Sequence, residues 1–537
     1  MSHSIEDYEI NHGFGSAPIE PQSPTAGKRT RKRWSFHESA KPNLVERPSV
    51  ASSQGRRRLS DVDGVHKHIN SDYISPAQLY STESGRLFHA GKICIILAGL
   101  PGRGKTHLSV SLTRYLRWLG VKTHVFHLGD YRRKNFDADL DQKLFIENNN
   151  ERLKLIDQCV NDILNFLEND LGQVAIYDAV NPFIKNRVEL DAKFKKLNIQ
   201  TLFIESSVTD DKIILKNMES AAKSSPDYVN WDYDKAYQDY SKRIEGLTPY
   251  YQPMGMEDDH NKLSYIKMIN FGERIELHNS SYGYLINKVV FFLMNSRIKS
   301  GSVFFARCYN NSVDFSDDPP LDEEGKRYAR NLSMTLMDYL KSQGKNYFDN
   351  SPEQSLHSNN SSSLSLKKQY SVDEKHLPAG ADGVDENSFV VWTSVKSRTV
   401  ETTRFFKDKN IKIRSRIQLS QKNPGIVGSM TEEEIAEKFP TEYEQFLKDP
   451  YHHRFSRAES YHDLAIKIEP LILEMERMSG DILIIADETV LKVFYGYLMA
   501  SSCFDIPSLH FAQDEIIEMK FNAYSNMSKT IGIKDYS

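Results

Sequence analysis

The chain has 537 residues, of which 39% are hydrophobic and 26% are charged. At about 100–200 residues per domain, this length predicts two to four domains. The 69 basic and 73 acidic residues nearly cancel to a net charge of −4. This balance excludes a uniformly basic nucleic-acid coat and a polyacidic tail protein.

The cysteines and the apolar runs indicate the compartment. Cys94, Cys159, Cys308 and Cys503 are too far apart for a zinc knuckle or a disulfide framework, which favours a reducing environment. No apolar run of about 18 residues occurs, so we expect no transmembrane helix. The first residues, MSHSIEDYEINHGFGSAP, lack the apolar centre of a secretion signal. We therefore expect a cytoplasmic protein.

Residues 1–88 are rich in Ser, Pro, Gly and charged residues and lack sustained periodicity, which predicts a disordered regulatory tail. Within this tail, residues 28–58 hold ten basic and two acidic residues, a local charge of +8. One interpretation is a flexible, solvated segment. Another is that KRTRKR, Lys28–Arg33, forms a nuclear signal or binds an anionic surface.

A third interpretation of the tail is phosphorylation. The segment RRRLS has the pattern that basic-directed protein kinases accept, and it makes Ser60 a candidate site. RKRWS is a weaker version that ends at Ser35. A phosphate beside several arginines would reorganise the tail locally.

From about residue 89 the pattern changes to short apolar runs that alternate with amphipathic stretches of helical length. Strands are predicted at Ile93–Ala98, Lys122–Leu128, Val174–Asp178 and Thr201–Ser206, with a helix at Leu153–Leu167. Strands that alternate with helices favour a parallel α/β sheet. We assign this first domain to residues 89–298.

A second series of strands begins near Ser302 and predicts another α/β domain over residues 299–537. Its strands are predicted at Ser302–Arg307, Phe389–Ser394, Ile482–Asp487 and Ile516–Phe521, with a helix at Leu464–Met478. The Ser/Asn-rich segment 351–388 has no core-forming pattern. We expect it to be a disordered surface insertion.

The segment after the first predicted strand fits the phosphate-binding loop pattern G-x-x-x-x-G-K-[ST]. It consists of Gly99, Leu100, Pro101, Gly102, Arg103, Gly104, Lys105 and Thr106. Its glycines allow backbone N–H groups to curl around phosphate oxygens, at the positive end of the following helix. We expect Lys105 to reach the β- and γ-phosphates of ATP and the Thr106 hydroxyl to bind Mg²⁺.

A phosphate-binding loop needs a second acidic partner for the metal, and Asp178 is the candidate. It ends the predicted strand VAIYD, and the carboxyl ends of parallel strands border the ligand crevice. The alternative is a buried carboxylate that caps the next turn. Lys105 and Asp178 are the candidate catalytic residues.

The segment LPGRGKTHLSVSLTRYLRWLGVKTHVFHLGDYRR closely resembles the kinase domain of the bifunctional 6-phosphofructo-2-kinase/fructose-2,6-bisphosphatase family. The resemblance continues to about residue 530 through SPDY, KRIE, YQP, LSYIK, LMN, EEGKRYA, WTSVKSRT, MTEEEI, ESYHDL and IEPLILEMER. It implies a P-loop kinase domain that makes fructose 2,6-bisphosphate from fructose 6-phosphate and ATP. It also implies a second, hydrolysing domain with the phosphoglycerate-mutase-like histidine-phosphatase fold, in a cytosolic and often dimeric protein.

The phosphatase chemistry that the resemblance implies needs a nucleophilic histidine, a second histidine and an acidic proton donor. These positions hold Cys308, Asp487 and Gln421. A cysteine phosphatase would need C-x5-R, but Asp314 stands six residues after Cys308. We therefore expect no phosphatase activity. Residual anion binding stays open because basic family positions are kept at Arg307, Arg398, Arg454 and Arg457.

In the kinase half, the nucleotide positions match the family and include Asn217 in the helix expected near the adenine. Arg132 and Arg243 stand where the family binds fructose 6-phosphate. Other sugar-phosphate positions are replaced, by Ile156, Val180, Asn186, Ala222 and Leu247, although Lys223 follows Ala222. Loss of three cationic contacts predicts sugar-phosphate binding weaker by roughly three to six orders of magnitude.

Three functions remain open. The first is a weak or re-specialised ATP-dependent kinase with a different acceptor. The second is a non-catalytic, nucleotide-binding pseudoenzyme that acts through partners, as a homodimer or as a heterodimer with active relatives. The third is an authentic 6-phosphofructo-2-kinase in which Lys223 and a rearranged loop compensate.

Overall fold

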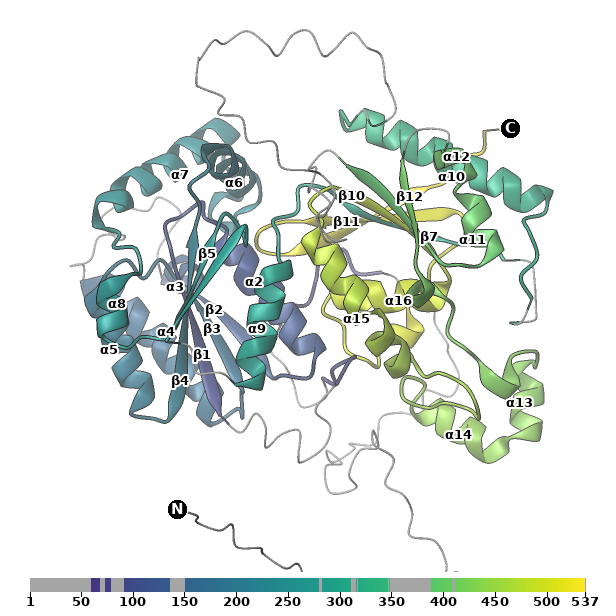
Figure 1. The fold of residues 1–537 in the computed structure, drawn as a ribbon, viewed down its shortest axis with the longest axis horizontal. Helices are drawn as coiled ribbons and strands as arrows, with labels where there is room; N and C mark the ends of the chain where they lie inside the picture. Colours follow the sequence, from purple (N-terminus) through teal and green to yellow (C-terminus); the bar gives the residue numbers. More distant parts are fainter. Residues whose placement is uncertain are drawn as a thin grey trace, which may run out of the picture.

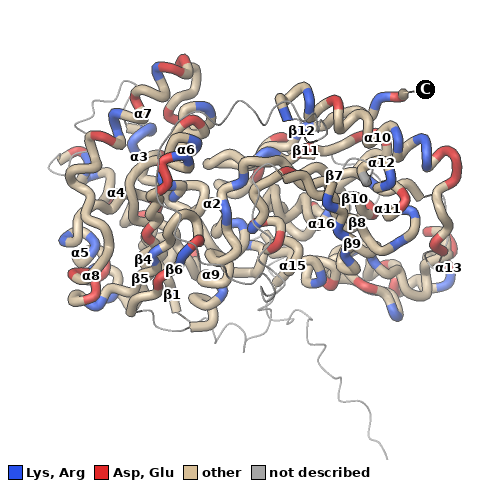
Figure 2. The backbone as a smooth tube through the Cα atoms, turned by 45° about the horizontal axis from the view of Figure 1, so that its top comes forward, with Lys and Arg blue, Asp and Glu red and all other residues tan. Residues whose placement is uncertain are grey.

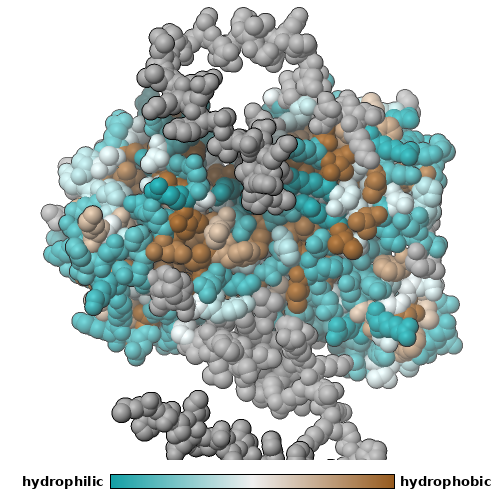
Figure 3. Space-filling model, viewed as in Figure 1, coloured by the Kyte–Doolittle hydropathy of each residue, from teal (hydrophilic) through white to brown (hydrophobic). Residues whose placement is uncertain are grey.

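A computed structural model describes residues 59–67, 73–78, 91–135, 150–279, 283–310, 315, 317–345, 347, 388–407 and 411–536. They form two α/β halves, each built around a six-stranded sheet (Figure 1). Acidic and basic residues are interspersed along the outer helices (Figure 2), and the face shown in Figure 3 is mostly hydrophilic. No described helix is long and apolar enough to cross a membrane.

The first sheet has the strand order β2-β3-β1-β4-β5-β6, and only β6 is antiparallel to its neighbour. Its strands are β1 (Lys92–Ala98), β2 (Thr123–His127), β3 (Val174–Asp178), β4 (Ile199–Ser207), β5 (Tyr265–Ile269) and β6 (Arg274–His278). Strand β1 is buried after its first residue, as expected for a strand covered on both faces. Because β1 and β3 are parallel neighbours, the loops that follow them meet at one edge of the sheet.

Helices cover both faces of this first sheet. They are α2 (Lys105–Trp118), α3 (Leu128–Asn135), α4 (Asn150–Glu168), α5 (Ile184–Lys195), α6 (Asp211–Ser224), α7 (Tyr233–Leu247), α8 (Met256–His260) and α9 (Tyr284–Asn295). The four predicted strands coincide with β1 to β4 within a few residues, and the predicted helix lies inside α4. The prediction of a mainly parallel α/β sheet is confirmed.

The second sheet has the order β12-β11-β7-β10-β8-β9. Its strands are β7 (Val303–Arg307), β8 (Phe389–Thr393), β9 (Lys412–Ser415), β10 (Asp481–Ala486), β11 (Glu515–Phe521) and β12 (Asn526–Gly532). Its helices are α10 (Glu323–Ser342), α11 (Ser397–Thr402), α12 (Arg404–Lys407), α13 (Glu432–Lys438), α14 (Pro440–Lys448), α15 (Tyr461–Arg477) and α16 (Glu488–Leu498). Strands β7 to β10 run parallel, whereas β11 is antiparallel to β7 and forms a hairpin with β12.

One hydrophobic core joins the two halves. Helices α2 and α9 of the first half face α15 and α16 of the second (Figure 1). The rings of Tyr115 and Phe292 stack with centroids 4.8 Å apart, and Trp118 meets Tyr497 edge-on at 5.5 Å. The Tyr115 hydroxyl also donates to Glu469 of α15 at 3.1 Å. The halves therefore share packing that neither would retain alone.

Two N-terminal segments depart from the predicted tail. Residues 59–67, here called the strap, form a β-bridge from Val62 to Met527 and bury Asp63 and Val65. In residues 73–78, Ala77 is fully buried. The expectation of disorder throughout residues 1–88 is wrong for these two segments. Each segment contributes one or two apolar side chains to a surface made by the rest of the chain. A hydrophobic period can only be recognised over a longer run of residues, so the sequence pattern did not reveal these contacts.

Other predictions fall outside the described residues. They concern Ser35, the basic segment 28–33 and the insertion up to residue 387. The predicted domain boundary at residue 298 lies between α9 and β7, and it stays a prediction.

Phe292→Ala tests the shared core. Phe292 is fully buried, so the truncation should lower the free energy of unfolding by about 3–5 kcal/mol. Because the halves share this core, we expect one cooperative unfolding transition that moves as a whole. Denaturant unfolding of the full chain, followed by circular dichroism, measures both effects.

The neighbouring Phe291 provides the control because half of its side chain is exposed. Phe291→Ala should change the stability by no more than about 0.5 kcal/mol. Two separate transitions, of which Phe292→Ala shifts only one, would show that the halves unfold independently.

Candidate functional site

The phosphate-binding loop connects β1 to α2. Gly99, Gly102 and Gly104 have φ angles of 136°, 74° and 73°, in the region that favours glycine. A Cβ atom at Gly99 would lie 2.6 Å from the carbonyl oxygen of Ser206. No side chain caps the N-terminus of α2, so its first N–H groups stay available to an anion.

Thr106 and Asp178 lie in contact because β1 and β3 end side by side. The Thr106 hydroxyl donates to Oδ2 of Asp178 at 2.8 Å, and Nδ1 of His127 lies 2.8 Å from the same oxygen. Burial alone would raise the pKa of Asp178, but its bond to His127 and the charges of His127 and Lys105 hold that pKa below the usual value. Asp178 is therefore a carboxylate.

These oxygens fit the magnesium ion that the loop pattern implies. Hydroxyl and carboxylate groups are the hard ligands that Mg²⁺ prefers, and this ion usually takes one or two from the protein and the rest from phosphates and water. No group of three or more His, Cys, Asp or Glu side chains in the described part of the chain is placed to hold a metal. Thr106 and Asp178 would therefore hold Mg²⁺ together with nucleotide phosphates, whose charge the ion would neutralise.

Lys105 is the first residue of α2 and lies under the loop. Its Nζ donates to the carbonyl oxygen of Leu100 at 2.8 Å. Burial lowers the pKa of Lys105 to about 8. The charge of Asp178 partly opposes this lowering, and a nucleotide phosphate would add further negative charge beside the buried ammonium group.

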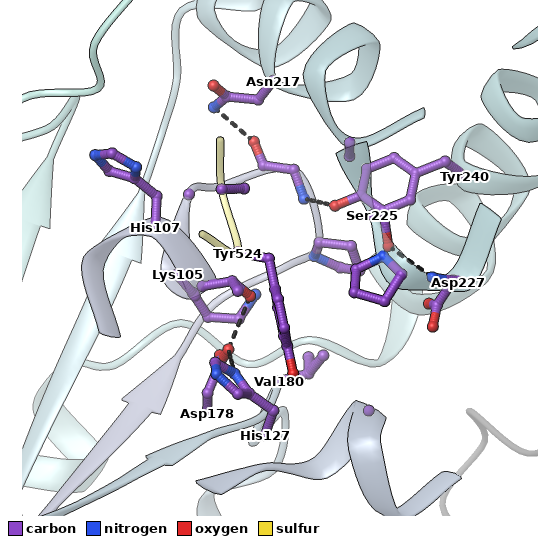
Figure 4. Close-up of a pocket in the computed structure, with 18 of the residues that line it drawn as sticks. Lys105, His107, His127, Asp178, Val180, Asn217, Ser225, Asp227, Tyr240 and Tyr524 are labelled. Atoms are coloured by element: carbon purple, nitrogen blue, oxygen red, sulfur yellow. Dashed lines mark hydrogen bonds and ion pairs between the residues drawn. The ribbon is translucent and has the colours of Figure 1, made fainter. Parts of the chain in front are cut away.

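The loop borders a cavity of about 270 Å³ (Figure 4). Asn217 of α6 lines it and donates from Nδ2 to the carbonyl oxygen of Gly102 at 2.9 Å. The Tyr240 hydroxyl accepts from the Gly102 N–H at 2.8 Å. These bonds fix the loop from the side opposite Asp178.

Three arginines at the far end of the cavity converge on one carboxylate. Arg132, Arg133 and Arg243 all bond to Asp227, the last at 2.7 Å. Burial would raise the pKa of Asp227, but Arg132 and Arg243 hold it far below the usual value. Arg133 also pairs with Asp130, and Arg243 with Asp239 at 2.9 Å. Three carboxylates thus balance three guanidinium groups.

In the second half, Cys308 follows β7 and is buried. Burial, reinforced by the nearby charge of Asp487, raises the pKa of the Cys308 thiol to about 12, although a hydrogen bond from Arg398 opposes this. Arg398 also donates to Oε1 of Gln421 at 3.1 Å. The structure therefore brings Cys308, Asp487, Arg398 and Gln421 together, with an un-ionised thiol at the centre.

The other arginines predicted for this second site have carboxylate partners or lie outward. Arg307 pairs with Glu488 at 3.3 Å. Arg454 has a half-exposed side chain that pairs with Asp463 at 3.3 Å, and Arg457 occupies a turn with φ of 60°. The sequence analysis did not identify Glu488, although it directly follows Asp487.

Two family models match the chain. The 6-phosphofructo-2-kinase model matches residues 80–300, and the histidine phosphatase superfamily (branch 1) model matches residues 381–533. A Saccharomyces cerevisiae protein, provisionally named 6-phosphofructo-2-kinase/fructose-2,6-bisphosphatase, is 40% identical over 98% of this chain and 98% of its own. The chain belongs to the 6-phosphofructo-2-kinase/fructose-2,6-bisphosphatase family.

More distant relatives carry the same family name or part of it. Human 6-phosphofructo-2-kinase/fructose-2,6-bisphosphatase 1 is 30% identical over 80% of this chain and 82% of its own. The fructose-2,6-bisphosphatase of S. cerevisiae is 29% identical over 81% and 87%. The predicted resemblance and fold class are confirmed. A P-loop kinase-type domain precedes a histidine-phosphatase-type domain, and the kinases of this family use ATP with Mg²⁺.

The positions at which the sequence analysis expects replaced side chains fall into two groups. Val180 and Leu247 are lining residues, whereas Ile156, Asn186 and Ala222 are not among them. The ammonium of Lys223 lies 5.3 Å from the centroid of the Tyr233 ring and does not line the cavity either. Lys223 is thus not in place to make the compensating contact that the sequence analysis left open.

Sequence reasoning missed several lining residues. Arg152 lies one turn before Ile156 on α4, so its helical spacing was a usable signal. His127 ends β2, and Tyr524 comes from the turn between β11 and β12. No local pattern connects Tyr524 to a nucleotide site.

The pKa of Cys308 leads to a test of its reactivity. With a pKa of about 12, only about one thiol in ten thousand is ionised at pH 8, and the thiolate is the reactive form. Cys308 should therefore resist iodoacetamide at pH 8 in the folded chain and become reactive only as the pH approaches 12. Peptide mass spectrometry after timed alkylation measures this.

The unfolded chain in denaturant is the control, in which all four cysteines should be alkylated. Selective and rapid labelling of Cys308 in the folded chain would contradict the assignment of an un-ionised thiol.

Proposed function

We propose that this family member binds ATP·Mg²⁺ in its kinase-type domain, lacks bisphosphatase activity and acts as a regulatory or non-catalytic protein of fructose 2,6-bisphosphate metabolism. The observation that carries the proposal is the contact between Thr106 and Asp178 beside Lys105. It provides a hydroxyl, a carboxylate and an ammonium group at one loop, which is the set that phosphate and magnesium require.

The charge balance at the far end of the cavity supports weak binding of fructose 6-phosphate. A sugar phosphate would need the guanidinium groups of Arg132 and Arg243, which are already engaged with Asp227. It would therefore have to displace a buried carboxylate before gaining its own contacts. Val180 and Leu247 add apolar surface to the lining of the same cavity.

The alternative is an active ATP-dependent kinase, either a 6-phosphofructo-2-kinase or an enzyme with a different acceptor. Arg152 supports this alternative because it lines the cavity one turn from the replaced position Ile156. It would restore one of the lost cationic contacts.

The absence of bisphosphatase activity is supported by Cys308. A buried thiol with a raised pKa does not attack phosphorus, and Asp487 places another negative charge beside it. Glu488 competes for Arg307, which weakens residual anion binding.

Lys105→Ala tests ATP binding. The substitution removes a charge that would contact the β- and γ-phosphates, so the affinity for ATP·Mg²⁺ should fall by about 10–100-fold. Titration calorimetry on the full chain measures the dissociation constant.

Lys185→Ala is the control, since Lys185 is exposed, pairs with Glu189 in the same helix and does not line the cavity. Its ATP affinity should equal that of the parent. No binding of ATP·Mg²⁺ by the parent chain would refute the proposed function.

Asp227→Asn tests the balance of charges. It removes the carboxylate shared by three arginines, so the site becomes cationic and attracts a phosphate dianion. Fructose 6-phosphate should then bind about 10–100-fold more tightly than to the parent, the contribution of one charge-assisted contact. Titration calorimetry with fructose 6-phosphate measures the change.

Asp239→Asn is the matched control because Asp239 pairs with Arg243 at 2.9 Å, whereas Asp227 contacts all three arginines. It should give a smaller gain. Unchanged or weaker binding by Asp227→Asn would show that Asp227 organises the site instead of blocking it. Turnover of fructose 6-phosphate by the parent at about 1–100 per second would favour the active-kinase alternative.

Further predictions concern partners, modification and location. We expect a homodimer or a heterodimer with active relatives, a protein kinase that acts on the tail, and no nucleic-acid or membrane partner. Ser60 is exposed, and its carbonyl oxygen accepts from the Tyr495 hydroxyl at 2.8 Å. A phosphate on Ser60 would therefore lie where the strap meets the second domain. A cytoplasmic location, with nuclear entry through residues 28–33, also stays a prediction.

A further inference from the structure

Three aromatic side chains from distant parts of the chain meet beside Asp178. His66 belongs to the strap, His127 ends β2, and Tyr524 lies in the turn of the β11–β12 hairpin. His66 stacks on Tyr524 with centroids 4.1 Å apart and planes inclined by 16°. His127 lies 5.2 Å from His66 and 5.0 Å from Tyr524. We call these three residues the aromatic cluster. Figure 4 shows Tyr524 and His127 beside Lys105 and Asp178.

The aromatic cluster reaches the metal site through His127. The carboxylate of Asp178 only accepts hydrogen bonds, so Nδ1 of His127 must carry the proton in the 2.8 Å contact with Oδ2. The Thr106 hydroxyl donates to the same oxygen. His127 therefore holds one oxygen of Asp178 toward Thr106 and sets the direction in which the carboxylate points.

The strap and the hairpin hold each other and press the aromatic cluster together. Nε2 of His66 donates to the carbonyl oxygen of Tyr524 at 2.6 Å. The backbone N–H of Asn526 donates to buried Asp63 at 2.8 Å. The Tyr524 hydroxyl donates to Asp130 of α3 at 2.8 Å. The second domain is thereby tied to the wall of the nucleotide cavity.

We propose that the aromatic cluster positions Asp178 for magnesium, so that Mg²⁺-dependent nucleotide binding requires the strap and the C-terminal hairpin to be docked. His127 is the positioning residue, and His66 and Tyr524 hold its ring in place. This inference rests on the proposed binding of ATP·Mg²⁺. It adds that two segments outside the kinase-type sheet control the metal part of that binding.

The size of the effect follows from the behaviour of groups that orient metal ligands. Loss of such a partner typically lowers metal affinity by about 10–100-fold. Without the Nδ1–H donor, the hydrogen bond to Asp178 that remains among the described residues comes from Thr106, a hydroxyl that is itself needed by the metal. Loss of Tyr524 or His66 leaves the donor present but frees the imidazole to tilt, which should give a smaller loss.

The test measures ATP affinity of the full chain by titration calorimetry, once with excess Mg²⁺ and once with excess EDTA. The ratio of the two affinities isolates the metal contribution. His127→Ala should lower this ratio by about 10–100-fold and leave the affinity in EDTA unchanged. His127→Asn, whose amide can donate from nearly the same place as Nδ1, should retain most of the ratio. Tyr524→Ala and His66→Ala should lower it partly, and Tyr524→Phe, which keeps the ring, should lower it less than Tyr524→Ala.

His278→Ala is the matched control. His278 also stacks on a tyrosine, Tyr265 at 4.4 Å, and pairs with an aspartate, Asp259 at 3.2 Å, but it lies on edge strand β6 away from the cavity. Its ratio should equal that of the parent. Thermal unfolding of each variant shows whether it is folded.

The possible failures are distinguishable. If the parent binds no ATP under either condition, the proposed function is wrong, and this inference falls with it. If the parent binds ATP with a Mg²⁺-dependent gain and folded His127→Ala keeps that gain, the positioning role is wrong and the proposed function stands. An equal loss with and without Mg²⁺ would overturn the inference too, since it would indicate a distorted cavity. Full Mg²⁺ dependence in both Tyr524→Ala and His66→Ala would refute control by the docked segments.

Discussion

The packing of α2 against the second domain is the contact on which the candidate nucleotide site depends. This helix begins at Lys105, directly after the phosphate-binding loop, and its far end carries Tyr115 and Trp118 into the shared core. The direction of the helix axis sets where its first N–H groups point. The second domain therefore helps to orient the loop even though it contributes none of the glycines. The histidine-phosphatase-type domain thus serves the kinase-type domain through packing, whatever its own chemistry.

Both candidate sites contain basic residues whose charge is already balanced within the chain. Asp227 engages three arginines in the first domain, and Glu488 engages Arg307 in the second. An incoming phosphate must compete with a carboxylate that the fold already holds against the arginine. The phosphate loses translational entropy on binding, whereas the carboxylate does not. Counting basic residues in the sequence overestimates the affinity of such a site, because the count ignores where the acids lie. At the phosphate-binding loop, by contrast, the Thr106 hydroxyl and the Asp178 carboxylate lie in contact beside Lys105, and no such competition arises in the proposed binding of a nucleotide and its metal.

Much of the fold was predictable because it follows from local patterns. One continuous stretch of sequence forms buried strand β1, the glycine-rich loop and α2. Its apolar runs predict the strand and the helix, and its glycines predict the loop with positive φ angles. Asp178 could be chosen because a strand end carries its residue to a known edge of a parallel sheet. The strap was mispredicted for the opposite reason. Asp63 is buried because β12 and α2 cover it, through the N–H of Asn526 at 2.8 Å and the pair with Arg114 at 3.4 Å.

Residue types and their spacing were enough to predict the family, the two α/β folds, the glycine-rich loop that would hold phosphate, and the position of Cys308 at the end of a strand. These features depend on residue type and on spacing along the chain. Which charges cancel and which rings meet depends instead on contacts between segments that are distant in the sequence. His66 and Tyr524 are 458 residues apart in the sequence and share a hydrogen bond, and the arginines around Asp227 come from two separate helices. Coulomb interactions, hydrogen bonds and ring stacking act over a few ångströms in space, a distance that the linear order of residues does not contain.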